Sequence, residues 1–160
     1  MHPANKWLIG VIPATLISGA ALLEGTRYYA YNDLAGIPTV CMGYTGKGIV
    51  FGKKYTHEEC VTFLKTELTI HANGVIKCVN QPLKENEFVA FTLMAYNIGV
   101  QGFCGSRALK LFNEGKTAEA CKAMAFGPSG KPAWSYVGDK FVQGLHNRRL
   151  YEMRMCYGNG

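Results

Sequence analysis

Two carboxylates and a hydroxyl lie close together near the amino terminus, at Glu24, Asp33 and Thr39. Glycoside hydrolysis needs two carboxyl groups facing one cleft: one gives its proton to the leaving oxygen, and the other stays ionised. An apolar stretch ends at Glu24, and apolar surroundings disfavour the charged form of a carboxyl group. Asp33 lies among polar turn residues and is expected to stay ionised. This contrast predicts Glu24 as the acid and Asp33 as its partner, unless they serve only as a helix-end residue and a turn residue.

Local signals predict the elements that position these residues. Gly25 marks the end of a helix at Glu24. Residues 28–31 are expected to form a short strand and residues 37–44 the returning strand, because turn-forming residues separate them. A helix end that leads into a hairpin can bring one carboxylate from each element to the same cleft.

The pattern from Glu24 onward resembles the signature of the phage-type lysozymes of the T-even kind, glycoside hydrolase family 24. The matching residues are Glu24-Gly25, Arg27, Ala30-Tyr31, Asp33, Gly36, Thr39, Gly43 and Thr45-Gly46. The resemblance implies an inverting muramidase that hydrolyses the β-1,4 bond between N-acetylmuramic acid and N-acetylglucosamine in peptidoglycan, with no cofactor and no metal. It also implies that Glu24 is the general acid, Asp33 the base or electrostatic partner, and Thr39 the residue that positions the water.

Two later stretches resemble the same family. They are Phe91 with Tyr96-Asn97-Ile98-Gly99, and Gly144-Leu145 with Arg148-Arg149 and Glu152. The resemblance implies a mostly helical, two-lobed α+β fold with a small antiparallel hairpin sheet and a long connecting helix. Arg107 departs from the family pattern, which often has threonine there, so the resemblance assigns it no sugar contact. An arginine of the terminal helix, Arg148 or Arg149, is a candidate partner for Glu24.

We expect an N-terminal apolar segment over residues 1–23 and a lysozyme catalytic domain over residues 24–160. Thr56 followed by Glu59 predicts a capping box at the start of the connecting helix. Within the catalytic domain, the hairpin lobe is expected at about 24–55, the connecting helix at about 56–79 and the second lobe at about 80–160. Further helices are expected at 84–97, 107–113 and 117–125, followed by a loop at 126–138.

The chain is basic, with a net charge of +6 and an isoelectric point of about 9.0. A basic surface suits a polyanionic partner such as nucleic acid or bacterial cell wall. The lysines and arginines are scattered and form no nucleic-acid-binding motif. We therefore expect a monomer that binds the glycan strands of peptidoglycan and no nucleic acid.

The chain contains six cysteines, at positions 41, 60, 78, 104, 121 and 156. No Cys-x-x-Cys motif and no histidine at ligand spacing is present, so zinc is not expected. An even number of widely spaced cysteines predicts three disulfides and an oxidising compartment, with six buried thiols as the alternative. Sequence alone does not choose the pairing. We expect neighbours in chain order to pair: Cys41–Cys60, Cys78–Cys104 and Cys121–Cys156.

The run from Trp7 to Leu23 contains no charge and is near the lower limit of roughly 17 residues for crossing a bilayer. A cleaved signal peptide and a buried helix of a soluble enzyme are two interpretations. Cleavage near residues 18–21 would leave Glu24 without its helix. The third interpretation is a weakly apolar signal-anchor-release segment, which resembles the secreted endolysins of phages of Gram-negative bacteria. It predicts export, tethering to the inner membrane through residues 7–23, and release into the periplasm of the infected host before lysis.

Candidate sugar contacts lie in the second half of the chain. Trp134 and Tyr136 are candidates for stacking on sugar rings, although Trp134 could equally belong to the core. Ser106 is expected to cap a helix and is a third candidate. A lytic transglycosylase and a non-catalytic cell-wall-binding protein are the main alternative functions. The family spacing of Asp33 and Thr39 argues against the first, and the hydrophilic remainder of the chain argues against a membrane pore former.

Overall fold

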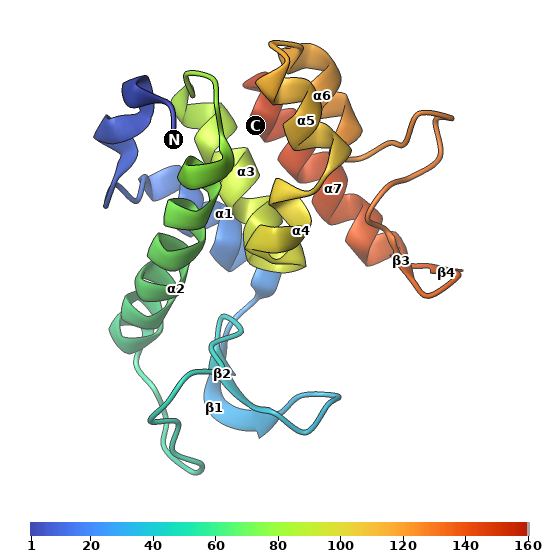
Figure 1. Ribbon diagram of the computed structural model, residues 1–160. Helices are drawn as coiled ribbons and strands as arrows, with labels where there is room; N and C mark the ends of the chain where they lie inside the picture. Colours follow the sequence, from blue (N-terminus) through green and yellow to red (C-terminus); the bar gives the residue numbers. More distant parts are fainter. Residues whose placement is uncertain (160) are drawn as a thin grey trace. The chain divides into compact units, whose positions relative to one another are not determined.

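A computed structural model describes residues 1–159 of the chain. The chain folds into two compact units, one made of Met1–Val11 with His71–Gly160 and the other of Ile12–Ile70. We call them unit 1 and unit 2. Figure 1 labels the elements in chain order. The structure is mostly helical with small antiparallel sheets, which confirms the α+β class.

Unit 2 begins with helix α1 (Ala14–Glu24), which ends where the sequence predicted. Gly25 adopts φ 70°, a left-handed conformation that glycine tolerates, and its N–H donates to the carbonyl of Ala21 at 3.0 Å. The chain then forms strands β1 (Arg27–Asn32) and β2 (Pro38–Cys41), which pair antiparallel. Glu24 is therefore the last residue of α1, and the first strand of the hairpin begins at Arg27.

Helix α2 (His57–Cys78) starts at the predicted capping box. The N–H of Thr56 donates to Glu59 Oε2 at 2.8 Å, and the N–H of Glu59 donates to Thr56 Oγ1 at 3.1 Å. Within unit 2, the ring of Phe63 stacks on Tyr44 with centroids 4.1 Å apart. This stack leaves no space for a side chain at Gly46, because a Cβ there would overlap the Tyr44 ring.

Unit 1 is built around α3 (Glu85–Ile98), which packs against α7 (Gln143–Tyr157). The ring of Phe91 lies 5.1 Å from Phe103 and 5.0 Å from Phe112, centroid to centroid. These three rings form part of the buried core of unit 1. The remaining helices of the unit are the 3-10 helix η1 (Pro3–Leu8), α4 (Val100–Cys104), α5 (Arg107–Asn113) and α6 (Thr117–Ala123), together with the end of α2.

A second hairpin, not expected from the sequence, precedes α7. Strand β3 (Tyr136–Val137) pairs with β4 (Lys140–Phe141) across a turn at Gly138, which has φ 60°. The expected loop therefore ends in two very short strands. Strands of this length carry too few alternating residues to be recognised from sequence.

The amino-terminal residues are part of unit 1. Asn5 is completely buried. Its side chain donates to the carbonyl of Gln81 at 2.9 Å and accepts from the N–H of Leu83 at 2.8 Å. These bonds fix η1 to the connection between α2 and α3, with a buried polar group fully paired.

The uncharged run from Trp7 to Leu23 is divided between elements. It covers the end of η1, a bend at Gly10 with φ 74°, and then α1, which begins only after Pro13. Of the residues in α1, Leu16, Gly19 and Ala20 are buried. Within residues 1–159, no helix combines the length and the apolar character needed to cross a bilayer.

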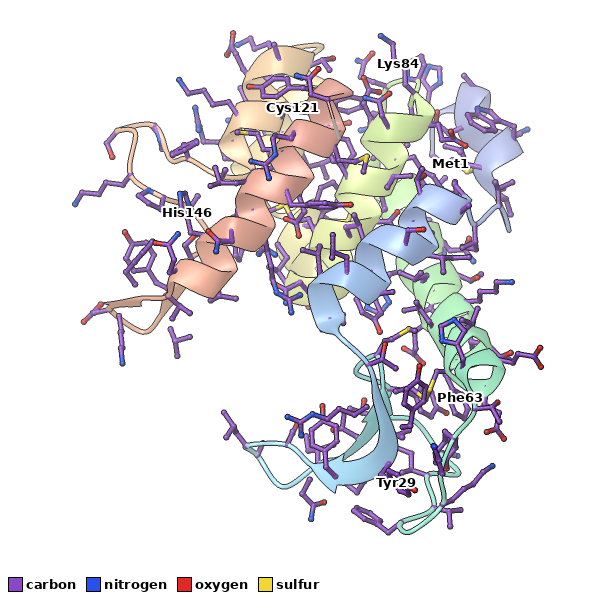
Figure 2. The ribbon with its side chains drawn as sticks, turned by 180° about the vertical axis from the view of Figure 1, so that it is seen from behind. Met1, Tyr29, Phe63, Lys84, Cys121 and His146 are labelled. Atoms are coloured by element: carbon purple, nitrogen blue, oxygen red, sulfur yellow. A yellow bond between two sulfur atoms is a disulfide. The ribbon has the colours of Figure 1, made fainter. Side chains whose placement is uncertain are left out.

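Three disulfides are present, and they join the pairs expected from chain order. Cys41–Cys60 lies in unit 2, while Cys78–Cys104 and Cys121–Cys156 lie in unit 1. Figure 2 shows Cys121 with its side chain at the helices of unit 1. Each bond connects a helix to a segment distant in sequence. In the loop-entropy view, a crosslink over such a separation stabilises the fold by about 3 kcal/mol.

Candidate active site

Glu24 and the hairpin of unit 2 approach each other at Gly43. A Cβ placed on Gly43 would lie 3.7 Å from Glu24 Oε2, so the Gly43 backbone lies beside the carboxylate. Gly43 has φ 84°, a conformation that favours glycine. Glu24 itself is half-buried at the end of α1. The sequence had matched Gly43 to the family pattern without giving it a role, and the structure places it next to the candidate acid.

Asp33 holds the turn of the same hairpin. Its Oδ1 accepts from the N–H of Ala35 at 2.8 Å and from that of Ile37 at 2.9 Å. Its own N–H donates to the carbonyl of Ile37 at 3.0 Å. Among the described residues, all hydrogen bonds of this carboxylate go to Oδ1, so Oδ2 is the oxygen that can face a water.

Thr39 stands on β2 and is 4% exposed. It pairs with Tyr31 across the hairpin. Its hydroxyl donates to the carbonyl of Ile37 at 2.9 Å. Because the hydroxyl proton is used within the protein, Oγ1 offers a lone pair to an incoming donor such as water.

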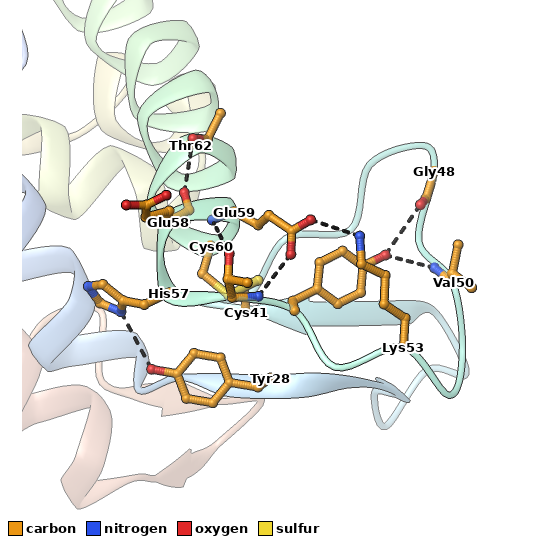
Figure 3. Close-up of a disulfide and its surroundings, with 12 residues drawn as sticks. Tyr28, Cys41, Gly48, Val50, Lys53, His57, Glu58, Glu59, Cys60 and Thr62 are labelled. Carbon is orange, nitrogen blue, oxygen red and sulfur yellow. Dashed lines mark hydrogen bonds and ion pairs between the residues drawn. A yellow bond between two sulfur atoms is a disulfide. The ribbon is translucent and has the colours of Figure 1, made fainter.

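A disulfide fixes the turn that carries Gly43. Val40 and Tyr44 exchange two backbone hydrogen bonds of 2.9 Å each, which closes a tight turn after β2. Cys41 in this turn has φ 62°, unusual for a residue other than glycine. Its sulfur is bonded to Cys60 in the first turns of α2 (Figure 3). The position of Gly43 beside Glu24 is thus set by a covalent crosslink as well as by the turn.

Charged groups tie the following loop to α2. Lys53 Nζ lies 2.8 Å from Glu59 Oε1 and 4.5 Å from the centroid of the Tyr55 ring (Figure 3). The hydrogen bond from Lys53, followed by that from the Thr56 backbone, lowers the pKa of the Glu59 carboxyl. The same bond raises the pKa of the Lys53 ammonium. The side chains of Lys53 and Glu59 are 44% and 38% exposed, so solvent screens this pair, which orients the loop and adds little stability.

The three candidate sugar contacts, Ser106, Trp134 and Tyr136, differ in their exposure to solvent. Ser106 is 5% exposed, and its hydroxyl donates to the carbonyl of Phe103 and accepts from the N–H of Leu109. It serves as the helix cap that the sequence predicted, and its hydrogen-bonding groups are used inside the protein. Trp134 and Tyr136 are each 42% exposed. The alternative that placed Trp134 in the core is therefore wrong, because Trp134 is exposed and is not among the buried residues.

Arg149 is completely buried in unit 1. Its Nε lies 2.8 Å from Glu152 Oε2, and its Nη2 donates to Glu152 Oε1 at 2.9 Å and to Asn97 Oδ1 at 2.7 Å. A buried arginine needs such a two-point carboxylate partner to offset the loss of its hydration. From the sequence, Arg149 was one of two candidate partners for Glu24. In the structure, its hydrogen bonds to Glu152 and Asn97 join α7 to α3.

The sequence from residue 21 to residue 152 matches the model of the phage lysozyme family. The chain belongs to this family. The lysozyme is 37% identical over 157 residues to a SAR-endolysin of Pseudomonas phage phiKMV, a match that covers 95% of this chain and 92% of the relative. Glu24, Asp33 and Thr39 all lie inside the family match.

Solved structures give the same assignment. The lysozyme superposes on a P22 lysozyme mutant with a TM-score of 0.81 and 29% identity, covering 91% of this chain and 97% of that chain. It also superposes on the muramidase domain of SpmX from Asticaccaulis excentricus, with a TM-score of 0.78 and 25% identity. That match covers 91% of this chain and 97% of the SpmX chain. The protein is therefore a glycoside hydrolase that lyses peptidoglycan.

Proposed function

We propose that this lysozyme is an exported endolysin of glycoside hydrolase family 24, in which Glu24, Asp33 and Thr39 carry the reaction. It cleaves the β-1,4 bond between N-acetylmuramic acid and N-acetylglucosamine with inversion. The observation that carries the proposal is the placement of the Glu24 carboxylate against Gly43. That contact sets the acid beside the same hairpin whose turn is held by Asp33 and whose second strand buries Thr39.

The reaction follows from the three side chains. The protonated Glu24 carboxyl gives its proton to the glycosidic oxygen as the bond from that oxygen to the anomeric carbon breaks. A water attacks the anomeric carbon from the opposite face, and Asp33 Oδ2 takes the proton that the water loses. Thr39 Oγ1 accepts a hydrogen bond from the same water and fixes its direction. Inversion by this route requires roughly 6.5–9.5 Å between the two carboxyl groups.

We further propose that residues 1–23 are a signal-anchor-release segment and that residues 24–160 form the catalytic domain. Within it, the hairpin lobe covers about 24–55, the connecting helix about 56–79 and the second lobe about 80–160. The name of the phiKMV relative supports this proposal. Leu16, Gly19 and Ala20 of α1 are buried in the folded unit, so under this proposal the segment has to leave the bilayer before unit 2 can form. Release from the inner membrane into the periplasm then precedes folding around Glu24.

Digestion of purified Gram-negative sacculi tests the reaction class. We expect each cleavage to leave a reducing N-acetylmuramic acid end, because water is the nucleophile. Mass spectrometry of the borohydride-reduced fragments detects such ends. Anhydro-muramic acid ends would show a lytic transglycosylase instead, and intact sacculi with bound protein would show a binding protein without catalysis.

A further inference from the structure

Three large aromatic side chains on or beside the β3–β4 hairpin of unit 1 are exposed to solvent. The exposed fractions are 42% for Trp134, 42% for Tyr136 and 40% for Phe141. We call these three residues the hairpin platform. Tyr136 and Phe141 are opposite each other in the two strands and therefore share one face of the hairpin. His146, labelled in Figure 2, lies at the start of α7 next to the hairpin. Exposed aromatic side chains on one short segment indicate a binding surface.

Ring contacts join two residues of the hairpin platform to each other and to α7. Tyr136 and Phe141 face each other across the two strands, with ring centroids 5.7 Å apart. The Phe141 ring also lies 5.8 Å from the ring of His146. Between the two exposed rings of Trp134 and Tyr136, Ser135 is completely buried and its hydroxyl donates to the carbonyl of Ala133 at 2.9 Å. The buried Ser135 thus fixes the backbone between the two exposed residues Trp134 and Tyr136.

Trp134 has a backbone conformation that a bulky residue rarely adopts. Its φ is 53°, in the left-handed region, where the Cβ of a non-glycine residue is crowded. Such strain persists only where the surrounding structure fixes it, and it is enriched at sites that bind ligands. Because Trp134 is 42% exposed and lies outside the buried core, core packing alone does not account for a tryptophan in this strained conformation.

We propose that the hairpin platform binds the sugar rings of the peptidoglycan glycan strand by stacking. Pyranose rings present apolar C–H faces, and aromatic faces carry the negative potential that attracts such hydrogens. The exposed Asp139 and Lys140 at the turn provide partners for sugar hydroxyl and acetamido groups. The occupant is the enzyme's own polymer, which offers many identical rings, so this inference rests on the proposed function. The charges of Asp139 and Lys140 cancel at the hairpin tip, so the hairpin carries no basic cluster that would favour an anionic membrane surface.

Tryptophan fluorescence gives a direct test, because the chain contains only two tryptophans, Trp7 and Trp134. In a Trp7→Phe, Glu24→Gln variant, emission reports on Trp134 alone and no substrate is consumed. We expect a saturable blue shift on adding the tetramer of N-acetylglucosamine. Emission that stays unchanged up to millimolar tetramer, and also on binding to sacculi, would overturn the proposal.

The Trp134→Gly variant separates binding from folding. Glycine accepts a positive φ, which offsets part of the packing that is lost with the tryptophan ring, so we expect the variant to keep a cooperative melting transition. In the Glu24→Gln background, we expect affinity for sacculi in a sedimentation assay to fall about three- to tenfold, the scale of a lost aromatic contact. Tyr157→Ala is the matched control, because Tyr157 is also 42% exposed in unit 1 but lies outside the platform.

Four outcomes would contradict the inference. The first three are unchanged affinity in Trp134→Gly, an equal loss in Tyr157→Ala, and loss of binding to vesicles of anionic phospholipid rather than to sacculi. The fourth is loss of the cooperative melting transition in Trp134→Gly, which would show a structural role for the ring. If Glu24→Gln kept full lytic activity, the proposed catalytic roles would fail, while the binding measurements would still decide the role of the platform.

Discussion

Replacing Glu24 with glutamine lowers the rate of peptidoglycan hydrolysis by on the order of 10²- to 10⁴-fold, the usual contribution of a positioned general acid. The amide keeps the size of the side chain beside Gly43 but has no proton to give to the leaving oxygen. The measurement is the fall in turbidity of purified sacculi under saturating substrate. Circular dichroism melting establishes that the variant is folded.

Two other carboxylates complete this test, one as a control and one as the second catalytic group. Glu85→Gln removes an exposed carboxylate of α3 and is expected to leave the rate unchanged. Asp33→Asn removes the charge but keeps an oxygen that can accept from Ala35 and Ile37, so the turn is expected to form and the rate still to fall. Activity of Glu24→Gln within threefold of the native enzyme would contradict the assignment of the acid.

The second prediction with a large expected effect concerns the uncharged run from Trp7 to Leu23. Thr15 and Ser18 lie on α1 and are exposed in the folded protein. Replacing both with leucine makes the run more apolar without disturbing the buried face of α1. Each leucine favours the membrane, and a combined gain of about 1.4 kcal/mol corresponds to a tenfold shift toward the tethered form. We therefore expect retention in the membrane fraction and lysis of the cell delayed or lost.

Two controls separate membrane retention from damage to the enzyme. The purified double variant, assayed on sacculi in detergent-free solution, is expected to match the native rate. A conventional membrane anchor fused ahead of Met1 through a flexible Gly/Ser linker keeps the enzyme on the membrane but lets residues 1–23 fold, and it is expected to be active. Full lytic activity with the Thr15 and Ser18 leucines still in the bilayer would refute the requirement for release.

The parts of the fold that the sequence predicted well depend on local signals. Gly25 ends α1 because of its own backbone freedom, and Thr56 with Glu59 caps α2 through bonds within one turn. Ser106 caps α5 in the same way. Such contacts involve residues at most a few positions apart, so their pattern is visible in the sequence alone.

The parts that could not be predicted depend on contacts between distant residues. Asn5 looked like one polar residue in a polar terminus, yet its partners Gln81 and Leu83 lie more than seventy positions away. The pairing of Arg149 with Asn97 joins two helices in a similar manner. The closeness of Gly43 and Glu24 also depends on how the hairpin returns toward α1. None of these contacts leaves a local pattern.

The most direct test of the account is the anomeric configuration of the first product. Proton NMR of sacculi fragments, recorded before mutarotation, distinguishes the α from the β form of the new N-acetylmuramic acid end. If Glu24 protonates the leaving oxygen and Asp33 activates a water on the opposite face, the β-linked substrate gives the α anomer first. A β anomer as the first product would contradict the role of Asp33 as the base that activates the water.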